Sequence, residues 1–124
     1  MNTPDHYQSV MPYFVVKDAA AFIGFLTDVF GAKELLAVRN DDDSIKHAEY
    51  NINGGTIMIG QSSDQWPAYK LSNFILVKDV DDVYAKGLAS GGAGNQEPSD
   101  QEYGRAAGFI DVWGNQWWLN NPEA

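Results

Sequence analysis

Hydrophobic and polar positions follow the same order in the two halves of this chain. In each half an apolar run ends in a Lys-Asp pair, and the two aspartates, Asp18 and Asp79, lie 61 positions apart. A glycine follows each aspartate after 13 positions, at Gly31 and at Gly92. Because a repeated order of this length is typical of a motif that is built twice, the pattern predicts two tandem modules.

Each aspartate is predicted to begin a helix, since a carboxylate at this place accepts the free N–H groups of the first turn. Behind Asp18, apolar residues recur at the three- and four-residue spacing of a helix with one buried face: Phe22, Phe25, Leu26, Val29 and Phe30. Gly31 is suited to the left-handed conformation that ends a helix. The same signals predict a second helix from Asp79 to Gly91-Gly92.

The remaining segments are predicted to form strands that are joined in part by glycine turns. The expected strands are roughly 10–17, 33–40, 45–53, 56–60, 71–77, 93–97, 104–112 and 116–120. Each half is therefore strand–helix–strand–strand–strand, which gives an α+β fold. We expect one domain over residues 1–124, with module one at about 9–60, a linker at 61–70 and module two at about 71–120. The modules are expected to form a curved mixed sheet around a cleft, with the helices outside.

Composition and charge limit the kinds of molecule that this protein is expected to bind. A chain of 124 residues with a formal charge of −9 disfavours nucleic acid and anionic membranes as partners. No apolar run approaches the length of about 18 residues that a membrane-spanning helix needs. The absence of cysteine excludes disulfides and thiolate chemistry. The N-terminus lacks the pattern of a secretory signal, so we expect a cytoplasmic protein.

The closing stretch gives the repeat a specific resemblance. Tyr103-Gly104-Arg105 and the run from Asp111 to Leu119 resemble the common Asp-Pro-x-Gly-Asn-x-x-x-Leu motif of the vicinal oxygen chelate superfamily, with Val112 in place of the proline. That superfamily contains glyoxalases, extradiol dioxygenases and bleomycin-resistance proteins. Of these branches, this chain most resembles the bleomycin-resistance proteins. The resemblance covers about Ser9 to Asn120 and implies the fold more firmly than the activity.

The resemblance also implies where metal ligands, usually His and Glu, would lie. The implied positions fall about seven residues before each helix-start aspartate and four after each hairpin glycine, and they hold Met11, Met58, Ser72 and Trp118. Thioether, hydroxyl and indole groups do not supply the donors that a divalent cation needs. We therefore expect no metal and no other cofactor.

Alternation of side chains along the strands predicts which residues face the cleft. Trp66 is added because the linker is expected to fold over the mouth. The predicted ligand contacts are Trp118, Phe109, Arg105, His47, Glu49, Tyr13, Met11, Met58, Phe74 and Trp66. Aromatic rings and thioethers suit a planar or partly apolar organic molecule.

Three functions remain open on this basis. The preferred one is a bleomycin-resistance-like protein that binds a small, planar or aromatic molecule without a metal. The second is a metal-dependent lyase, isomerase or dioxygenase with a non-standard site. The third is a metal-independent enzyme in which His47 or Glu49 acts as a general base. The resemblance further implies a homodimer.

Overall fold

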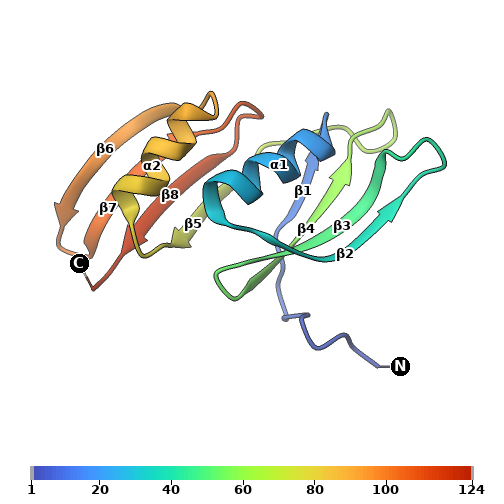
Figure 1. The fold of residues 1–124 in the computed structure, drawn as a ribbon, viewed down its shortest axis with the longest axis horizontal. Coiled ribbons are helices and arrows are strands. Elements are labelled where there is room, and N and C mark those ends of the chain that lie inside the picture. The colour runs from blue at the N-terminus through green and yellow to red at the C-terminus, as the bar shows by residue number, and fades with distance from the viewer. Residues whose placement is uncertain (1, 124) are drawn as a thin grey trace. The chain divides into compact units, whose positions relative to one another are not determined.

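The computed structural model describes residues 2–123. The chain forms two compact units, which divide between Tyr69 and Lys70. Each unit contains one helix and one four-stranded mixed sheet, as Figure 1 shows. The prediction of an α+β fold made of two β-α-β-β-β modules is confirmed. A cleft shared by the two modules stays a prediction.

The first unit consists of β1 (Tyr13–Val16), α1 (Ala19–Phe30), β2 (Lys33–Arg39), β3 (Ile45–Ile52) and β4 (Gly55–Gln61). Its sheet has the order β1-β4-β3-β2, in which β1 is parallel to β4 and the other pairs are antiparallel. The helix α1 lies across one face of this sheet (Figure 1).

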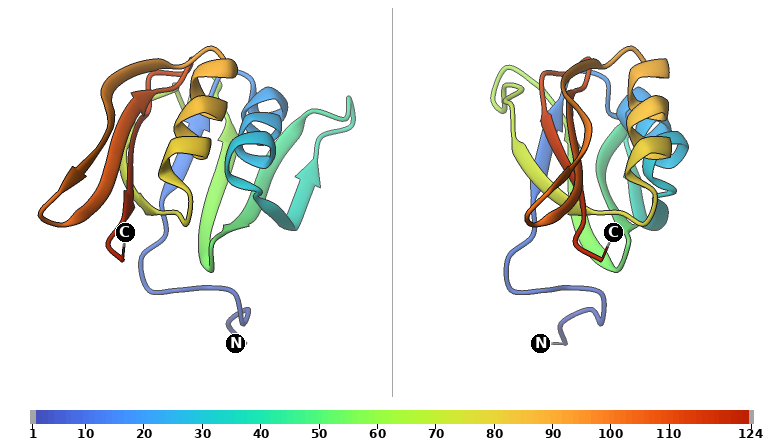
Figure 2. Two further views of the ribbon diagram at one scale, coloured as in Figure 1. Left: turned by 60° about the vertical axis from the view of Figure 1, so that its left-hand side comes forward. Right: turned by 90° about the vertical axis from the view of Figure 1, so that its left-hand side faces the viewer.

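The second unit repeats this arrangement. It consists of β5 (Ser72–Leu76), α2 (Val80–Ala89), β6 (Ala93–Gln101), β7 (Gly104–Ile110) and β8 (Gln116–Asn121). Its sheet has the order β5-β8-β7-β6, with β5 parallel to β8. Figure 2 shows α2 on one face of this sheet from two further directions. We call the other face of each sheet the helix-free face.

Both helices begin where the sequence predicts. The Asp18 carboxylate accepts a hydrogen bond from the Ala21 N–H at 3.1 Å, and the Asp79 carboxylate accepts one from the Asp82 N–H at 3.0 Å. Gly31 ends α1 in the left-handed conformation, with φ of 67°. Neither helix in residues 2–123 is long and apolar enough to cross a membrane.

Apolar side chains fill the space between each helix and its sheet. In the first unit the rings of Phe14 and Phe22 lie 5.0 Å apart and both are fully buried. In the second unit Trp117 and Leu119 of β8 are buried in the same way. The face of each sheet that the helix covers therefore forms the core. The helix-free face is available for side chains that do not pack against the helix.

The segment 62–69, which lies within the predicted linker of 61–70, belongs to the first unit. The Ser62 N–H donates to the Val16 carbonyl at 2.8 Å, and the Tyr69 N–H donates to the Val15 carbonyl at 3.3 Å. These bonds hold the segment along β1, so its side chains lie beside the helix-free face.

Candidate functional site

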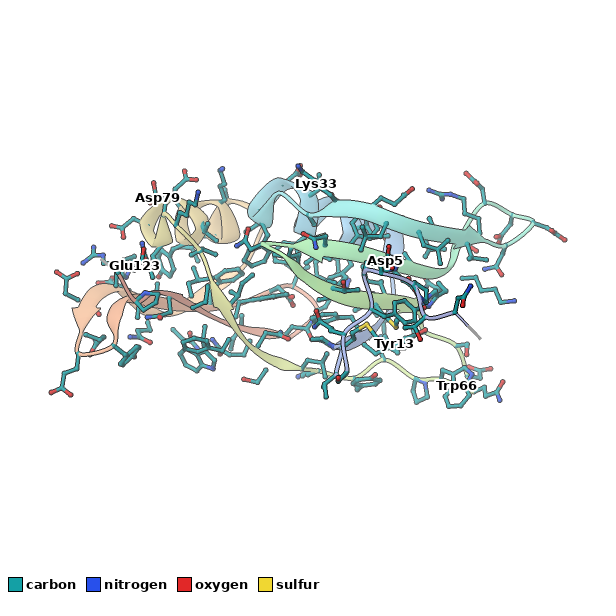
Figure 3. All side chains as sticks on the ribbon, turned by 90° about the horizontal axis from the view of Figure 1, so that it is seen from below. Asp5, Tyr13, Lys33, Trp66, Asp79 and Glu123 are labelled. Atoms are coloured by element: carbon teal, nitrogen blue, oxygen red, sulfur yellow. The ribbon has the colours of Figure 1, made fainter. Side chains whose placement is uncertain are left out.

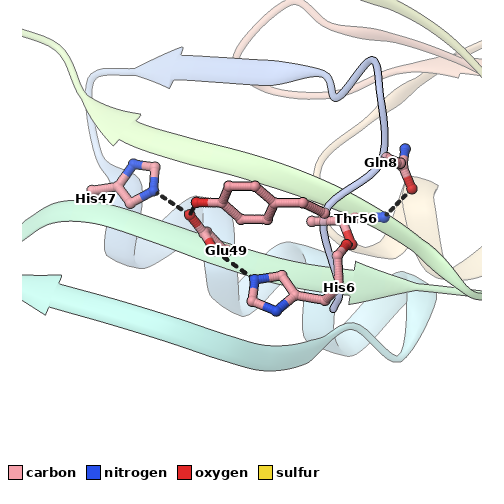
Figure 4. Close-up of polar contacts among 6 residues, drawn as sticks. His6, Gln8, His47, Glu49 and Thr56 are labelled. Carbon is pink, nitrogen blue, oxygen red and sulfur yellow. Dashed lines mark hydrogen bonds and ion pairs between the residues drawn. The ribbon is translucent and has the colours of Figure 1, made fainter. Parts of the chain in front are cut away.

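A buried carboxylate, that of Glu49, lies at the centre of the helix-free face of the first unit. Glu49 is only 1% exposed and stands opposite Met58 in the pairing of β3 with β4. Three side chains contact its two oxygens: His6 Nε2 lies 2.7 Å from Oε1, while the Tyr7 hydroxyl and His47 Nε2 lie 2.7 and 2.8 Å from Oε2. Figure 4 shows the two histidines on either side of the carboxylate. Both oxygens are therefore satisfied by direct partners.

The chain before β1 brings His6 and Tyr7 to this place. Thr56 of β4 donates its hydroxyl to the carbonyl of His6, and its N–H donates to the Gln8 side chain at 3.2 Å (Figure 4). These bonds hold residues 6–8 against β4. Neither His6 nor Tyr7 was among the ligand contacts predicted from the sequence, so both residues were missed.

These hydrogen bonds set the charge of Glu49. Burial alone raises the pKa of this carboxyl, but hydrogen bonds from His6, His47 and Tyr7 outweigh burial and lower the pKa to about 2. Glu49 is therefore a carboxylate at neutral pH, and its hydrogen bonds orient the side chains of His6, Tyr7 and His47.

His47 connects this buried carboxylate to Tyr13. The Tyr13 hydroxyl lies 3.0 Å from His47 Nδ1, on the side of the ring opposite the Nε2 that faces Glu49. Because a carboxylate only accepts hydrogen bonds, Nε2 carries a proton, and in the neutral form of the ring Nδ1 accepts from Tyr13. Burial and the neighbouring Tyr69 and Glu49 raise the pKa of Tyr13, so its hydroxyl keeps its proton at neutral pH.

A pocket of about 740 Å³ opens beside this hydrogen-bonded chain. The rings of Tyr13, His47, Trp66 and Tyr69 line it, together with Lys46. The Tyr69 hydroxyl donates to the Tyr13 carbonyl at 2.8 Å and so fixes the segment 62–69 at one wall. Trp66 is 65% exposed, and Figure 3 shows Tyr13 and Trp66 on the same side of this unit.

The second unit has a smaller pocket, of about 360 Å³, on its own helix-free face. Phe74, Tyr103 and Trp118 line it, and Phe74 is 64% exposed. Gly108 lies opposite Trp118, and a Cβ at this glycine would come within 2.7 Å of the indole ring. The glycine therefore makes room for Trp118 to lie flat against β7.

The structure does not bring two of the expected ligand contacts to the helix-free face. The prediction that Phe109 faces the cleft is wrong, because Phe109 is fully buried under α2, where a Cβ on Gly87 would lie 2.7 Å from its ring. The prediction for Arg105 is wrong in the same way. Its guanidinium donates two hydrogen bonds of 2.9 Å to Asp81 in the first turn of α2, and one of 3.2 Å to Asp100.

A difference in turn length explains both errors. Residues that stand opposite each other on neighbouring strands point to the same face of a sheet. In the first unit Asn51 pairs with Thr56, while in the second unit Ile110 pairs with Gln116, so the second turn holds one more residue. One extra residue inverts the face of every side chain on β7 relative to an alignment on the turn glycines.

The remaining expected contacts divide between the two units. Tyr13, His47, Glu49 and Trp66 come together in the first unit, whereas Phe74 and Trp118 come together in the second. Met58 stands beside Tyr13 and Glu49 in the strand pairing. Met11, which comes before β1, is half-buried.

The residues at the four implied ligand positions do not fit the divalent metal that metal-dependent members of the vicinal oxygen chelate superfamily use. Met11, Met58, Ser72 and Trp118 offer no carboxylate or imidazole donor. In the described part of the chain, no three His, Asp or Glu side chains are arranged to hold a metal ion. The carboxylate of Glu49 is instead hydrogen-bonded to the two histidines.

Comparisons with known proteins agree with this architecture. The model of the Glyoxalase/Bleomycin resistance protein/Dioxygenase superfamily matches residues 3–119. The uncharacterized protein Mb0911c of Mycobacterium bovis is 30% identical over 126 aligned residues, which cover 92% of this chain and 83% of that protein. The crystal structure of TioX from Micromonospora sp. ML1 has a TM-score of 0.75 at 23% identity, covering 92% of this chain and 98% of that one. FosX, a genomically encoded fosfomycin resistance protein from Listeria monocytogenes, has a TM-score of 0.68 at 23% identity, covering 91% of each chain. The family model spans both units, and the chain therefore belongs to the Glyoxalase/Bleomycin resistance protein/Dioxygenase superfamily.

Proposed function

We propose that this protein binds a small planar organic molecule, without a metal, in the pocket of the first unit. The observation that carries the proposal is the combination of aromatic walls with one polar end. Trp66 and Tyr69 supply flat apolar surfaces, and Tyr13 presents a hydroxyl that is held by His47. Aromatic rings with a few placed polar groups are typical of sites that orient a small ligand.

The size of the pocket fits this ligand class. A volume of about 740 Å³ lies within the range of roughly 300–1,000 Å³ that is usual for small-molecule sites. The exposed rings of Trp66, Tyr69 and Tyr13 also support the proposal, because they gather at one pocket and a grouped exposed apolar surface is typical of a binding site.

The comparisons connect this scaffold with resistance to fosfomycin and bleomycin, which agrees with a site for a small molecule. FosX is described as a fosfomycin resistance protein, and the family description includes bleomycin resistance. Because FosX shares only 23% identity with this chain, it contributes the fold and not the ligand. The homodimer and the cytoplasmic location stay predictions.

Replacing Trp66 with alanine is expected to weaken the binding of planar aromatic probes about tenfold, since a stacked aromatic contact contributes about 1–1.5 kcal/mol. Isothermal titration calorimetry with 2-naphthol, quinoline and acridine orange measures this loss. Acridine orange is included as a cation because the chain has a net charge of −9. Recovery of the unchanged probe distinguishes binding from catalysis.

Leu36→Ala is the matched control for this experiment. Leu36 is 41% exposed on β2 and lies outside the pocket lining, so this variant is expected to bind every probe like the parent protein. Equal affinities for the parent protein and Trp66→Ala contradict the proposed location of the site. Failure of the parent protein to bind any planar probe contradicts the function itself.

Metal content separates this proposal from a metal-dependent lyase, isomerase or dioxygenase. We expect the protein, purified without chelator, to carry far less than one divalent ion per chain, and probe affinity to be unchanged by EDTA. The reason is that both oxygens of Glu49 are already hydrogen-bonded to the Nε2 atoms of His6 and His47, so these atoms are not free to bind an ion. Inductively coupled plasma mass spectrometry measures the content, and one bound ion per chain contradicts the metal-free proposal.

A further inference from the structure

The hydrogen bonds that join Tyr13, His47 and Glu49 in the first unit form a chain with one end in the pocket and the other end buried. Glu49 is 1% exposed and does not line the pocket, whereas His47 and Tyr13 do. Both ring nitrogens of His47 are already engaged, by Glu49 at 2.8 Å and by Tyr13 at 3.0 Å. The hydroxyl oxygen of Tyr13 is therefore the atom of this hydrogen-bonded chain that contacts a bound molecule.

We propose that Tyr13, His47 and Glu49 form a relay that takes a proton from an acidic hydroxyl of the bound molecule, so that a planar phenol or enol is held as its anion. This inference rests on the proposed function and gives that function a ligand class. While Tyr13 donates to His47, its oxygen keeps lone pairs that accept from a donor in the pocket. The site therefore selects a ligand that brings an O–H group to this oxygen.

One proton moves in this step, and no electron transfer occurs. The O–H bond of the ligand breaks, and its proton binds the oxygen of Tyr13. The original Tyr13 proton passes to Nδ1 of His47, where a new N–H bond forms. The ligand becomes an anion, and His47 becomes an imidazolium whose Nε2–H faces the Glu49 carboxylate.

The charges around the relay favour this separated state. The Glu49 carboxylate stabilises the imidazolium, and Lys46 lines the same pocket as a cation for the ligand anion. The other titratable groups near the relay are His6 and Tyr7, which contact Glu49, and Tyr69, which lies near Tyr13. His6 and Tyr7 donate hydrogen bonds to Glu49 and so hold its carboxylate next to His47.

The test uses 4-nitrophenol, whose anion is yellow, and 4-nitroanisole, which lacks the hydroxyl. Absorbance is recorded at a pH about one unit below the pKa of the free dye, so that most of the free dye is neutral. Calorimetry gives the affinity of each dye in parallel. The variants are Tyr13→Phe, which keeps the ring that packs on Gly60, and His47→Gln, which leaves Tyr13 in place.

We expect the ratio of anion to neutral dye to be at least about tenfold higher for dye bound to the parent protein than for free dye, a shift of one pKa unit. Tyr13→Phe and His47→Gln are expected to bring this ratio back to within about twofold of the free dye, since a relay needs every member. Circular dichroism verifies the fold of each variant, and either variant alone decides the question.

The outcomes that overturn the relay are distinct from those that overturn binding. If the parent protein binds both dyes but 4-nitrophenol stays neutral, the relay is wrong and the binding function stands. If the ratio is equally high in both variants, Lys46 alone ionises the dye and the relay is again wrong. If neither dye binds, the relay fails, and the proposed function fails with it only when 2-naphthol, quinoline and acridine orange do not bind either.

Discussion

Replacing Phe109 with alanine is expected to lower the free energy of unfolding by about 3–5 kcal/mol, the usual loss for a buried phenylalanine. Phe109 is fully buried beneath α2 and stands opposite the buried Trp117 on β8. Gly87 of α2 lies so close to this ring that a Cβ on the glycine would come within 2.7 Å of it, so the ring fills the space beneath the helix. Urea unfolding followed by far-ultraviolet circular dichroism measures the change.

Phe74→Ala is the matched control, because it removes the same ring from the other face of the same sheet. Phe74 is 64% exposed, so we expect a change of less than about 1 kcal/mol in the free energy of unfolding. Both residues were predicted as ligand contacts from the sequence. Similar losses in the two variants contradict the placement of Phe109 under the helix.

The elements of this fold could be predicted because their signals are local. The cap at Asp18 and the stop at Gly31 lie within one helix length of each other, and the apolar spacing between them follows the helical period. Asp79 caps α2 in the same way, but α2 ends at Ala89, before the predicted Gly91-Gly92. Local signals of this kind determine where a helix begins and which of its faces is buried.

The faces of the strands could be predicted only where the turn between them was known. On β3 His47 and Glu49 lie on the same face as Met58, as side-chain alternation predicts, because Glu49 pairs with Met58 and His47 pairs with Gly60. On β7 the expected side was wrong, because the turn after Ile110 is one residue longer than its counterpart. Spacing of glycines does not reveal such an insertion, since both turns place a glycine near the tip.

The role of the N-terminal segment could not be predicted from periodicity, because residues 2–12 form neither helix nor strand. His6 meets Glu49 from 43 positions away, so no local pattern connects them. One signal was present: a glutamate inside a strand whose neighbours are buried requires partners, since a buried carboxylate is costly without them. A search of all the polar residues of the chain for donors to this carboxylate would have included His6 and Tyr7.

The two units share one architecture, but equivalent positions in them hold chemically different residues. Met58 and Trp118 occupy equivalent strand positions, 60 residues apart, and their partners are Glu49 and Gly108. The buried carboxylate of the first unit thus corresponds to a glycine in the second, which makes room for an indole ring. The polar relay therefore belongs to the first unit, and the second unit offers an apolar surface.

Replacing Glu49 with glutamine is expected to lower the free energy of unfolding at pH 7 by about 3 kcal/mol, in the range for a broken buried charge network. Both oxygens of Glu49 accept hydrogen bonds, and the amide group of glutamine places a donor against a donor at one of them. Urea unfolding measures the loss. Glu102→Gln, at an exposed position, is the matched control and is expected to change the free energy by less than about 0.5 kcal/mol.

The pH dependence of this loss tests its cause. The pKa of Glu49 falls from 4.5 to about 2 on folding, so the carboxylate contributes its full stabilisation above pH 4.5 and loses it as the pH falls toward 2. Protonated Glu49 resembles glutamine, and the difference in unfolding free energy between the parent protein and Glu49→Gln should therefore shrink across this window. A difference that is the same at pH 7 and at pH 3 would show that the loss comes from packing and not from the hydrogen bonds of His6, Tyr7 and His47 to the carboxylate.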